Sequence, residues 1–210
     1  MFTNSIFALS TVWGFSAISI IRISGSECSS ILKNLCGIKK PKNRYAYFAK
    51  IKNYNKELID CGIVIFFKGP NSFTGEDMLE LQLHGSPAVI KNLLSSLEDI
   101  KNLKPAEPGE FIKRAFLNKK MNLLQVEGTN SLISAETELQ RKIAANIVYG
   151  ETKSRCEYWM EKLINISAMI DALIEFNEED ETINFKSIKR LTIELIGEIK
   201  KSLEQLEISK

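Results

Sequence analysis

Over the first 120 residues, hydrophobic and polar positions alternate in short runs that glycine or proline separates. Successive side chains of a strand point to opposite faces, so this pattern predicts strands with one buried face. In residues 79–84 three leucines alternate with glutamate, glutamine and histidine, which makes this the clearest strand. Further strands are predicted over 17–23, 45–51 and 63–67, and the polar residues 53–56 between the last two favour a hairpin.

Helices are predicted between and after these strands. Ser86 and Pro87 favour a helix start, with Ser at the N-cap and Pro in the first turn, where its missing N–H costs nothing. A short helix is predicted to follow Pro108 and Gly109. Strands mixed with helices in this way predict an α+β first domain, which we place at residues 1–120.

From about residue 122 onward the hydrophobic spacing becomes helical and no proline occurs. Apolar residues recur every three or four positions over 139–147, 159–173 and 188–206. Gly150 and the acidic stretch 177–181 separate these three stripes. The pattern therefore predicts an all-α segment over 121–210, whose amphipathic helices need partners to bury their apolar faces.

The composition is that of an ordinary globular protein, with 44% hydrophobic and 26% charged residues. There are 28 basic and 26 acidic residues, so the net charge of +2 does not by itself favour RNA binding, and any RNA contact must be local or lie elsewhere. The four scattered cysteines show no metal-ligand spacing, which favours a reduced, cytoplasmic protein. We expect no signal peptide and no membrane span.

Three segments carry a specific resemblance to a known family: residues 21–25, 69–77 with the strand that follows, and 108–121. Their strings RISG, PNSFTGED and PGEFIKRAFLNKK resemble, in order and spacing, the N-terminal region of the MnmE (TrmE) family. Residues 135–138 and 174–180 resemble that family's helical domain. The resemblance implies a first domain with the fold of folate-dependent aminomethyltransferases, followed by the first part of a helical domain. The turn Trp13–Gly14–Phe15 departs from the family's usual glycine-rich turn.

The resemblance implies that Arg22, Glu80 and Lys120 contact a reduced folate, formyl- or methylene-tetrahydrofolate. A carboxylate such as Glu80 can accept two hydrogen bonds from the N–C–N edge of a pterin ring. Arg22 and Lys120 are suitable cations for the carboxylates of the glutamate tail, although which cation meets which end stays open. From the pattern alone, all three residues would be interpreted as solvent-facing surface charges.

Two other groups invite functional interpretations. His84 is the sole histidine and could act as a general base, but a structural role at a strand-to-helix turn is favoured. Lys113, Arg114, Lys119 and Lys120 form a basic cluster near Phe111 and Phe116. This cluster could contact RNA phosphates, but a helix with a solvated charged face and two core phenylalanines is favoured. We expect no catalytic residue and no metal ligand in this chain.

For the whole protein, the resemblance implies modification of carbon five of the wobble uridine of tRNA, by a homodimer working with the FAD-dependent partner MnmG. In the family, GTP hydrolysis with magnesium and potassium takes place in a separate domain inserted in the helical domain. The P-loop pattern GxxxxGK[ST] does not occur here: the nearest string, Gly69 to Glu76, has one residue too many between its glycines and Glu in place of Lys. We therefore expect a chain truncated before the GTPase domain, which does not hydrolyse GTP alone.

Two other interpretations stay open. The chain could be a degenerate or stand-alone dimerisation module that binds no folate, as the departure at Trp13–Gly14–Phe15 suggests. It could also be a folate-dependent aminomethyltransferase outside tRNA modification, although the resemblance of the helical segment favours the MnmE family.

Overall fold

The computed structural model describes residues 3–175 and 185–207. The chain divides into two compact units, 1–122 and 123–210, called here the N-terminal unit and the helical unit. Each is described by itself. The predicted break at the acidic stretch 177–181 lies outside the described residues.

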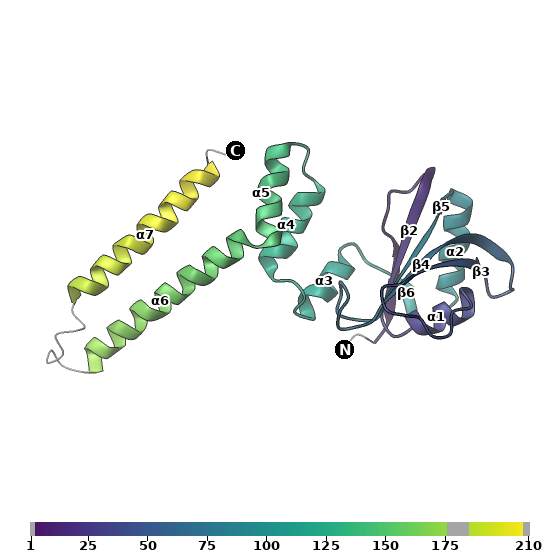
Figure 1. Ribbon diagram of the computed structural model, residues 1–210, viewed down its shortest axis with the longest axis horizontal. Coiled ribbons are helices and arrows are strands. Elements are labelled where there is room, and N and C mark those ends of the chain that lie inside the picture. Colours follow the sequence, from purple (N-terminus) through teal and green to yellow (C-terminus); the bar gives the residue numbers. More distant parts are fainter. Residues whose placement is uncertain (1–2, 176–184, 208–210) are drawn as a thin grey trace. The chain divides into compact units, whose positions relative to one another are not determined.

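The N-terminal unit contains a mixed six-stranded sheet of order β3-β4-β5-β2-β1-β6 (Figure 1). All pairings are antiparallel except that between β1 and β6. The strands are β1 (Ser5–Leu9), β2 (Ser16–Ser24), β3 (Ala46–Lys52), β4 (Leu58–Phe67), β5 (Met78–Gly85) and β6 (Leu103–Pro105). The four predicted strands and the β3–β4 hairpin are confirmed, whereas β1 and β6 were not predicted.

Three helices belong to this unit: α1 (Cys28–Leu35), α2 (Pro87–Glu98) and α3 (Glu110–Leu117). The predicted starts of α2 and α3 are confirmed, and α1 was not predicted. Ser86 occupies the N-cap position of α2, but its side chain makes no capping hydrogen bond. Gly109 precedes α3 with a φ of 76°, a left-handed conformation that glycine adopts without steric cost.

The core of the N-terminal unit lies between one face of the sheet and the helices α1 and α2. Leu79, Leu81 and Leu83, the apolar half of the alternating pattern, are buried there together with Leu32 of α1 and Leu93 of α2. Burial of each leucine side chain contributes about 1.5–3 kcal/mol before entropy costs. This confirms which face of β5 points inward.

The opposite face of the sheet carries both polar and exposed apolar side chains, and we call it the open face. The strand register pairs Arg22 with Glu80, Gln82 with Ile63, and Ile63 with Phe48, so these residues share that face. Phe48 is 80% exposed and Ile63 is 39% exposed. The open face is thus an accessible surface that begins at the Arg22–Glu80 pair and runs toward the β3 edge.

The helical unit consists of α4 (Leu123–Ile133), α5 (Glu138–Tyr149), α6 (Glu151–Glu175) and α7 (Phe185–Glu207) (Figure 1). A capping box formed by Thr137 and Gln140 begins α5. Ile166 of α6 packs with Ile188 and Leu195 of α7 in a small core. The three helices predicted from the stripes are confirmed, and α4 is an additional one.

No helix in the described ranges is both long and apolar enough to cross a membrane.

Candidate functional site

The strand register brings Arg22 of β2 directly opposite Glu80 of β5. Nε and Nη2 of Arg22 donate hydrogen bonds of 3.0 and 2.7 Å to Oε1 of Glu80. The two side chains are only 29% and 16% exposed, so this is not the solvent-facing surface charge that the pattern alone favours. Within the described part of the chain no hydrogen bond reaches Oε2 of Glu80, which leaves that oxygen able to accept one from a ligand.

A loop of residues 69–77, called here the 69–77 loop, lies beside two of the candidate residues, Arg22 and Lys120. The ring of Phe73 lies 5.5 Å from Cζ of Arg22, within cation–π range. Gly75 has a φ of 80°, and a Cβ placed on it would lie 3.3 Å from Cγ of Lys120. The structure therefore brings Arg22 and Glu80 into contact and places Lys120 against the same loop.

Lys120 owes its position to the way in which α3 ends. The N–H groups of Lys119 and Lys120 donate to the carbonyls of Phe116 and Ala115, the pair of bonds that defines a Schellman motif. Lys119 takes the left-handed conformation that this motif requires, with a φ of 58°. The chain thereby turns back toward Gly75 directly after the helix.

Arg114, a buried residue of α3, binds the 69–77 loop through Glu76. Its Nη1 lies 3.1 and 3.3 Å from the two carboxylate oxygens of Glu76, and its Nη2 donates to Glu110 and to the carbonyl of Asn4, both at 2.9 Å. The Arg114 side chain is only 2% exposed. A guanidinium can be buried at tolerable cost when carboxylates on two sides pair with it.

Hydroxyl groups complete this buried network. Ser24 Oγ donates to Glu76 Oε2 at 2.7 Å and lies 2.7 Å from the hydroxyl of Thr74. The amide of Asn118 donates to the carbonyl of Thr74 at 2.7 Å. Strand β2, the loop and α3 are therefore joined by side-chain hydrogen bonds. Sequence reasoning missed this role of Ser24, Thr74 and Glu76, although all three lie within the quoted motifs.

The interpretation of the basic cluster must be corrected in two respects. Arg114 is not on a solvated face, because Glu76 and Glu110 draw it into the interior. Phe116 is 41% exposed, so it is not a core residue. Lys113, Lys119 and Lys120 are exposed as expected.

Two carboxylates have lowered pKa values in this unit. Burial raises the pKa of Glu110, but hydrogen bonds from the Glu107 N–H and from Arg114, together with the nearby positive charges, outweigh burial and leave the pKa below its ordinary value. Burial likewise raises the pKa of Asp60, but the backbone N–H and the ring of His84 and the N–H of Cys61 outweigh it.

His84 is exposed, and its Nδ1 lies 3.0 Å from Asp60 Oδ1. Its backbone N–H also donates to Asp60, at 2.9 Å. Both contacts tie β5 to β4, which is what a structural role requires.

The cysteines offer no reactive pair in the structure, where all four are free. Burial raises the pKa of the Cys36 thiol to about 12, and burial with the nearby charges of Asp77 and Glu76 raises the pKa of Cys28 as well. Thiols with raised pKa values are poor nucleophiles at neutral pH. Among the described residues, no three His, Cys, Asp or Glu side chains gather as a metal site would require.

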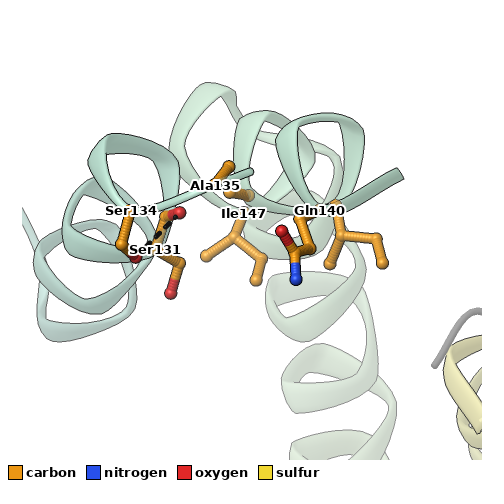
Figure 2. A pocket seen from close by; sticks show the side chains of 7 residues that line it. Ser131, Ser134, Ala135, Gln140 and Ile147 are labelled. Atoms are coloured by element: carbon orange, nitrogen blue, oxygen red, sulfur yellow. Dashed lines mark hydrogen bonds between the residues drawn. The ribbon is translucent and has the colours of Figure 1, made fainter. Parts of the chain in front are cut away.

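A separate cavity of about 280 Å³ lies between α4 and α5 (Figure 2). The amide oxygen of Gln140 at its rim already accepts hydrogen bonds from the N–H groups of Glu136 and Thr137. None of the described residues that line the cavity is charged, so none of them offers a positive charge to a carboxylate-bearing ligand. Its lining residues are Ser131, Ser134, Ala135, Gln140, Ile143, Ala144 and Ile147.

An α+β unit followed by a helical unit is the arrangement expected of a TrmE N-terminal domain followed by an MnmE helical domain. A family model described as GTP-binding protein TrmE N-terminus matches residues 5–120, and the MnmE helical domain matches residues 123–210. The chain belongs to the MnmE (TrmE) family.

Curated relatives agree with this assignment. The tRNA modification GTPase MnmE of Pelagibacter ubique is 45% identical over 207 residues, which cover 97% of this chain and 46% of the relative. The protein of the same name from Wolbachia pipientis subsp. Culex pipiens is 47% identical over 176 residues, covering 84% and 39%. That of Psychromonas ingrahamii is 43% identical over 177 residues, with the same coverage. The chain thus spans less than half the length of these relatives.

Proposed function

We propose that the N-terminal unit binds a reduced folate, formyl- or methylene-tetrahydrofolate, through Arg22, Glu80 and Lys120. The observation that carries the proposal is the Arg22–Glu80 pair on the open face. The 69–77 loop lies beside Arg22, and Lys120 lies against the same loop. Oε2 of Glu80 can accept a hydrogen bond from the N–C–N edge of the pterin, and the N–H groups of Arg22 not used by Glu80 can donate to an acceptor atom elsewhere on the ligand. Lys120 supplies an exposed positive charge for the carboxylates of the tail.

The folate would serve as the one-carbon donor for modification of carbon five of the wobble uridine of tRNA, in the cytoplasm. The relatives are named tRNA modification GTPases, which supports the part of this proposal that concerns tRNA modification. In this proposal MnmG is the FAD-dependent partner. In the same proposal, GTP, magnesium and potassium bind to the part of the relatives that this chain does not cover; the P-loop pattern does not occur in the 210 residues.

Homodimerisation is part of the same proposal. Exposed apolar side chains such as Phe48 and Ile63 on the open face favour contact with another protein surface. A second copy placed over this face would also shield the Arg22–Glu80 pair from water and so strengthen its contacts with a ligand.

Calorimetry with 5-formyl-tetrahydrofolate tests the folate proposal. Glu80→Ala removes a charged acceptor, and such hydrogen bonds contribute about 1.5–3 kcal/mol, so we expect at least a tenfold weaker affinity. The matched control is Glu57→Ala, which removes an exposed carboxylate from the loop before β4 and should leave affinity unchanged. Equal affinities of wild type and Glu80→Ala would overturn the proposal.

A second candidate function is dimerisation without folate binding. The connection between β1 and β2 carries Val12, Trp13 and Phe15, which are 89%, 55% and 92% exposed. Such apolar exposure favours a protein contact whether or not a ligand binds. Sedimentation that shows a dimer, with no saturable folate binding, would support this candidate over the first.

A further inference from the structure

Positive charge is concentrated in one segment of the N-terminal unit. Residues 39–56 contain seven lysines and arginines and no aspartate or glutamate, whereas the rest of the chain holds 21 basic and 26 acidic residues. A chain of nearly balanced charge therefore carries its entire positive excess in 18 residues. The seven cations are Lys39, Lys40, Lys42, Arg44, Lys50, Lys52 and Lys56.

In the fold, this segment forms one rim of the sheet, which we call the basic edge. It comprises the connection leading into β3, the edge strand β3 itself and the turn that follows. All seven cations are exposed except Lys52, which is half-buried. The charges therefore lie along a continuous stretch of surface at the end of the sheet.

None of these seven cations forms a salt bridge within the described parts of the chain, 3–175 and 185–207. Cations elsewhere in the same unit do, as in Lys68–Asp77 at 2.9 Å and Lys104–Glu110 at 3.7 Å. The charge of the basic edge is therefore not neutralised by ion pairs and is available to an anionic partner.

Aromatic side chains are interleaved with these charges. Tyr45 is 52% exposed, and its ring lies 5.8 Å from Nζ of Lys42 and 4.6 Å from the ring of Tyr47. The guanidinium of Arg44 lies 5.4 Å from the ring of Phe67. Exposed rings beside cations are the combination with which single-stranded nucleic acid is bound, since bases stack on rings and phosphates pair with cations.

Protection of an edge strand offers a simpler account of part of this pattern. Lysines on an edge discourage pairing with another sheet, and this would explain Lys50 and Lys52 in β3. It does not explain the four cations of the preceding connection, residues 39–44, where there is no strand edge to protect.

We propose that the basic edge is an RNA-binding surface. Its phosphate contacts come from Lys39, Lys40, Lys42 and Arg44, and an unpaired base stacks on the ring of Tyr45. The choice of RNA rests on the proposed function in tRNA modification. An anionic lipid surface is the less favoured candidate for the partner. Peripheral membrane binding commonly uses an amphipathic helix, whereas these charges lie on a loop and an extended strand.

The test compares two triple variants of the full chain that have the same net charge. Lys39→Gln, Lys40→Gln and Lys42→Gln remove three charges from the basic edge. Lys33→Gln, Lys91→Gln and Lys101→Gln remove three exposed charges outside it. Affinity for an unmodified tRNA transcript is measured by fluorescence anisotropy across a range of salt concentrations, and 5-formyl-tetrahydrofolate binding is measured by calorimetry.

We expect the basic-edge variant to bind tRNA at least tenfold more weakly. The plot of log affinity against log salt has a negative slope, and its magnitude should decrease by about 2–3, since each phosphate contact contributes about 0.7–0.9. The control variant should stay within twofold of wild type. Tyr45→Leu should weaken binding about fivefold or more without changing the slope, because it removes a stacking surface and no charge.

Equal losses in both triple variants would show an effect of net charge alone and would overturn the inference. So would wild-type binding to phosphatidylserine vesicles without binding to tRNA. Folate binding separates this inference from the proposed function. If folate binds but tRNA affinity is unaffected by the basic-edge variant, the inference alone fails; if wild type binds no folate, the folate proposal fails whatever the tRNA result.

Discussion

Arg114→Met would replace a buried guanidinium by an uncharged side chain of similar length. The Glu76 and Glu110 carboxylates, whose side chains are 17% and 11% exposed, would then lose their shared cation. Breaking a buried ion pair by removing one partner costs about 3–5 kcal/mol, and partial water access to the carboxylates favours the lower end. We therefore expect the N-terminal unit to lose about 3 kcal/mol of its free energy of unfolding, a large share for a domain.

Amide hydrogen exchange, followed by mass spectrometry, measures this loss in the N-terminal unit alone. A loss of about 3 kcal/mol corresponds to roughly 150-fold faster exchange in peptides covering β5, if these exchange by global opening. Peptides from α6 in the helical unit provide an internal reference. Lys113→Met, which removes the exposed cation next to Arg114, is the matched control and should change exchange little.

A further variant separates lost charge pairing from lost packing. Adding Glu76→Gln and Glu110→Gln to Arg114→Met leaves no unpaired carboxylate, so the triple variant should recover part of the stability. Exchange in Arg114→Met within threefold of wild type would refute the role of this network. A triple variant less stable than Arg114→Met would show that packing dominates.

Two more predictions concern the same unit. Because the pKa of Glu110 lies below its ordinary value of 4.5, ionisation of this group stabilises the fold above that pH and ceases to do so as pH falls through the folded-state pKa. Urea unfolding between about pH 6 and pH 3 should therefore show a smaller loss of stability in Glu110→Gln than in wild type, and identical losses would contradict this. Gly75→Ala strains a backbone with a φ of 80° and adds a methyl group against Lys120, so it should weaken folate binding as well as stability. Gly37→Ala imposes similar strain at a φ of 72° with no atom within 4 Å, so it should cost stability alone; equal folate affinity in both variants would count against a role for the loop.

Alternation of residue types was enough to predict β5 and its buried face, because the period of a strand is local information. The short strands were not predictable in this way. β6 has three residues and ends at Pro105, and it exists because its backbone pairs with β1, far away in sequence. α1 was missed because it has only eight residues and no capping side chain marks its start.

The candidate site could be predicted residue by residue only through the family resemblance. Pattern analysis treats charged residues as surface residues by default, so it could not show that Arg114 is buried between two carboxylates. Nor could it show that Arg22 stands opposite Glu80, since register is a property of the assembled sheet. The charge imbalance of residues 39–56 was visible in the sequence, but composition taken over the whole chain averages it away.

The Schellman turn that places Lys120 against Gly75 has a thermodynamic consequence. Arg22 and Glu80 lie on two strands and Lys120 follows a helix end. Arg22 and Glu80 pair, and Lys120 lies against the 69–77 loop, only when the sheet, the loop and α3 have all formed. An unfolded chain would offer a ligand none of this arrangement. Under the proposed folate binding, a folate present at about one hundred times its dissociation constant would add about 2.7 kcal/mol to the stability of the N-terminal unit. The free energy of unfolding of this unit would then depend on the concentration of reduced folate.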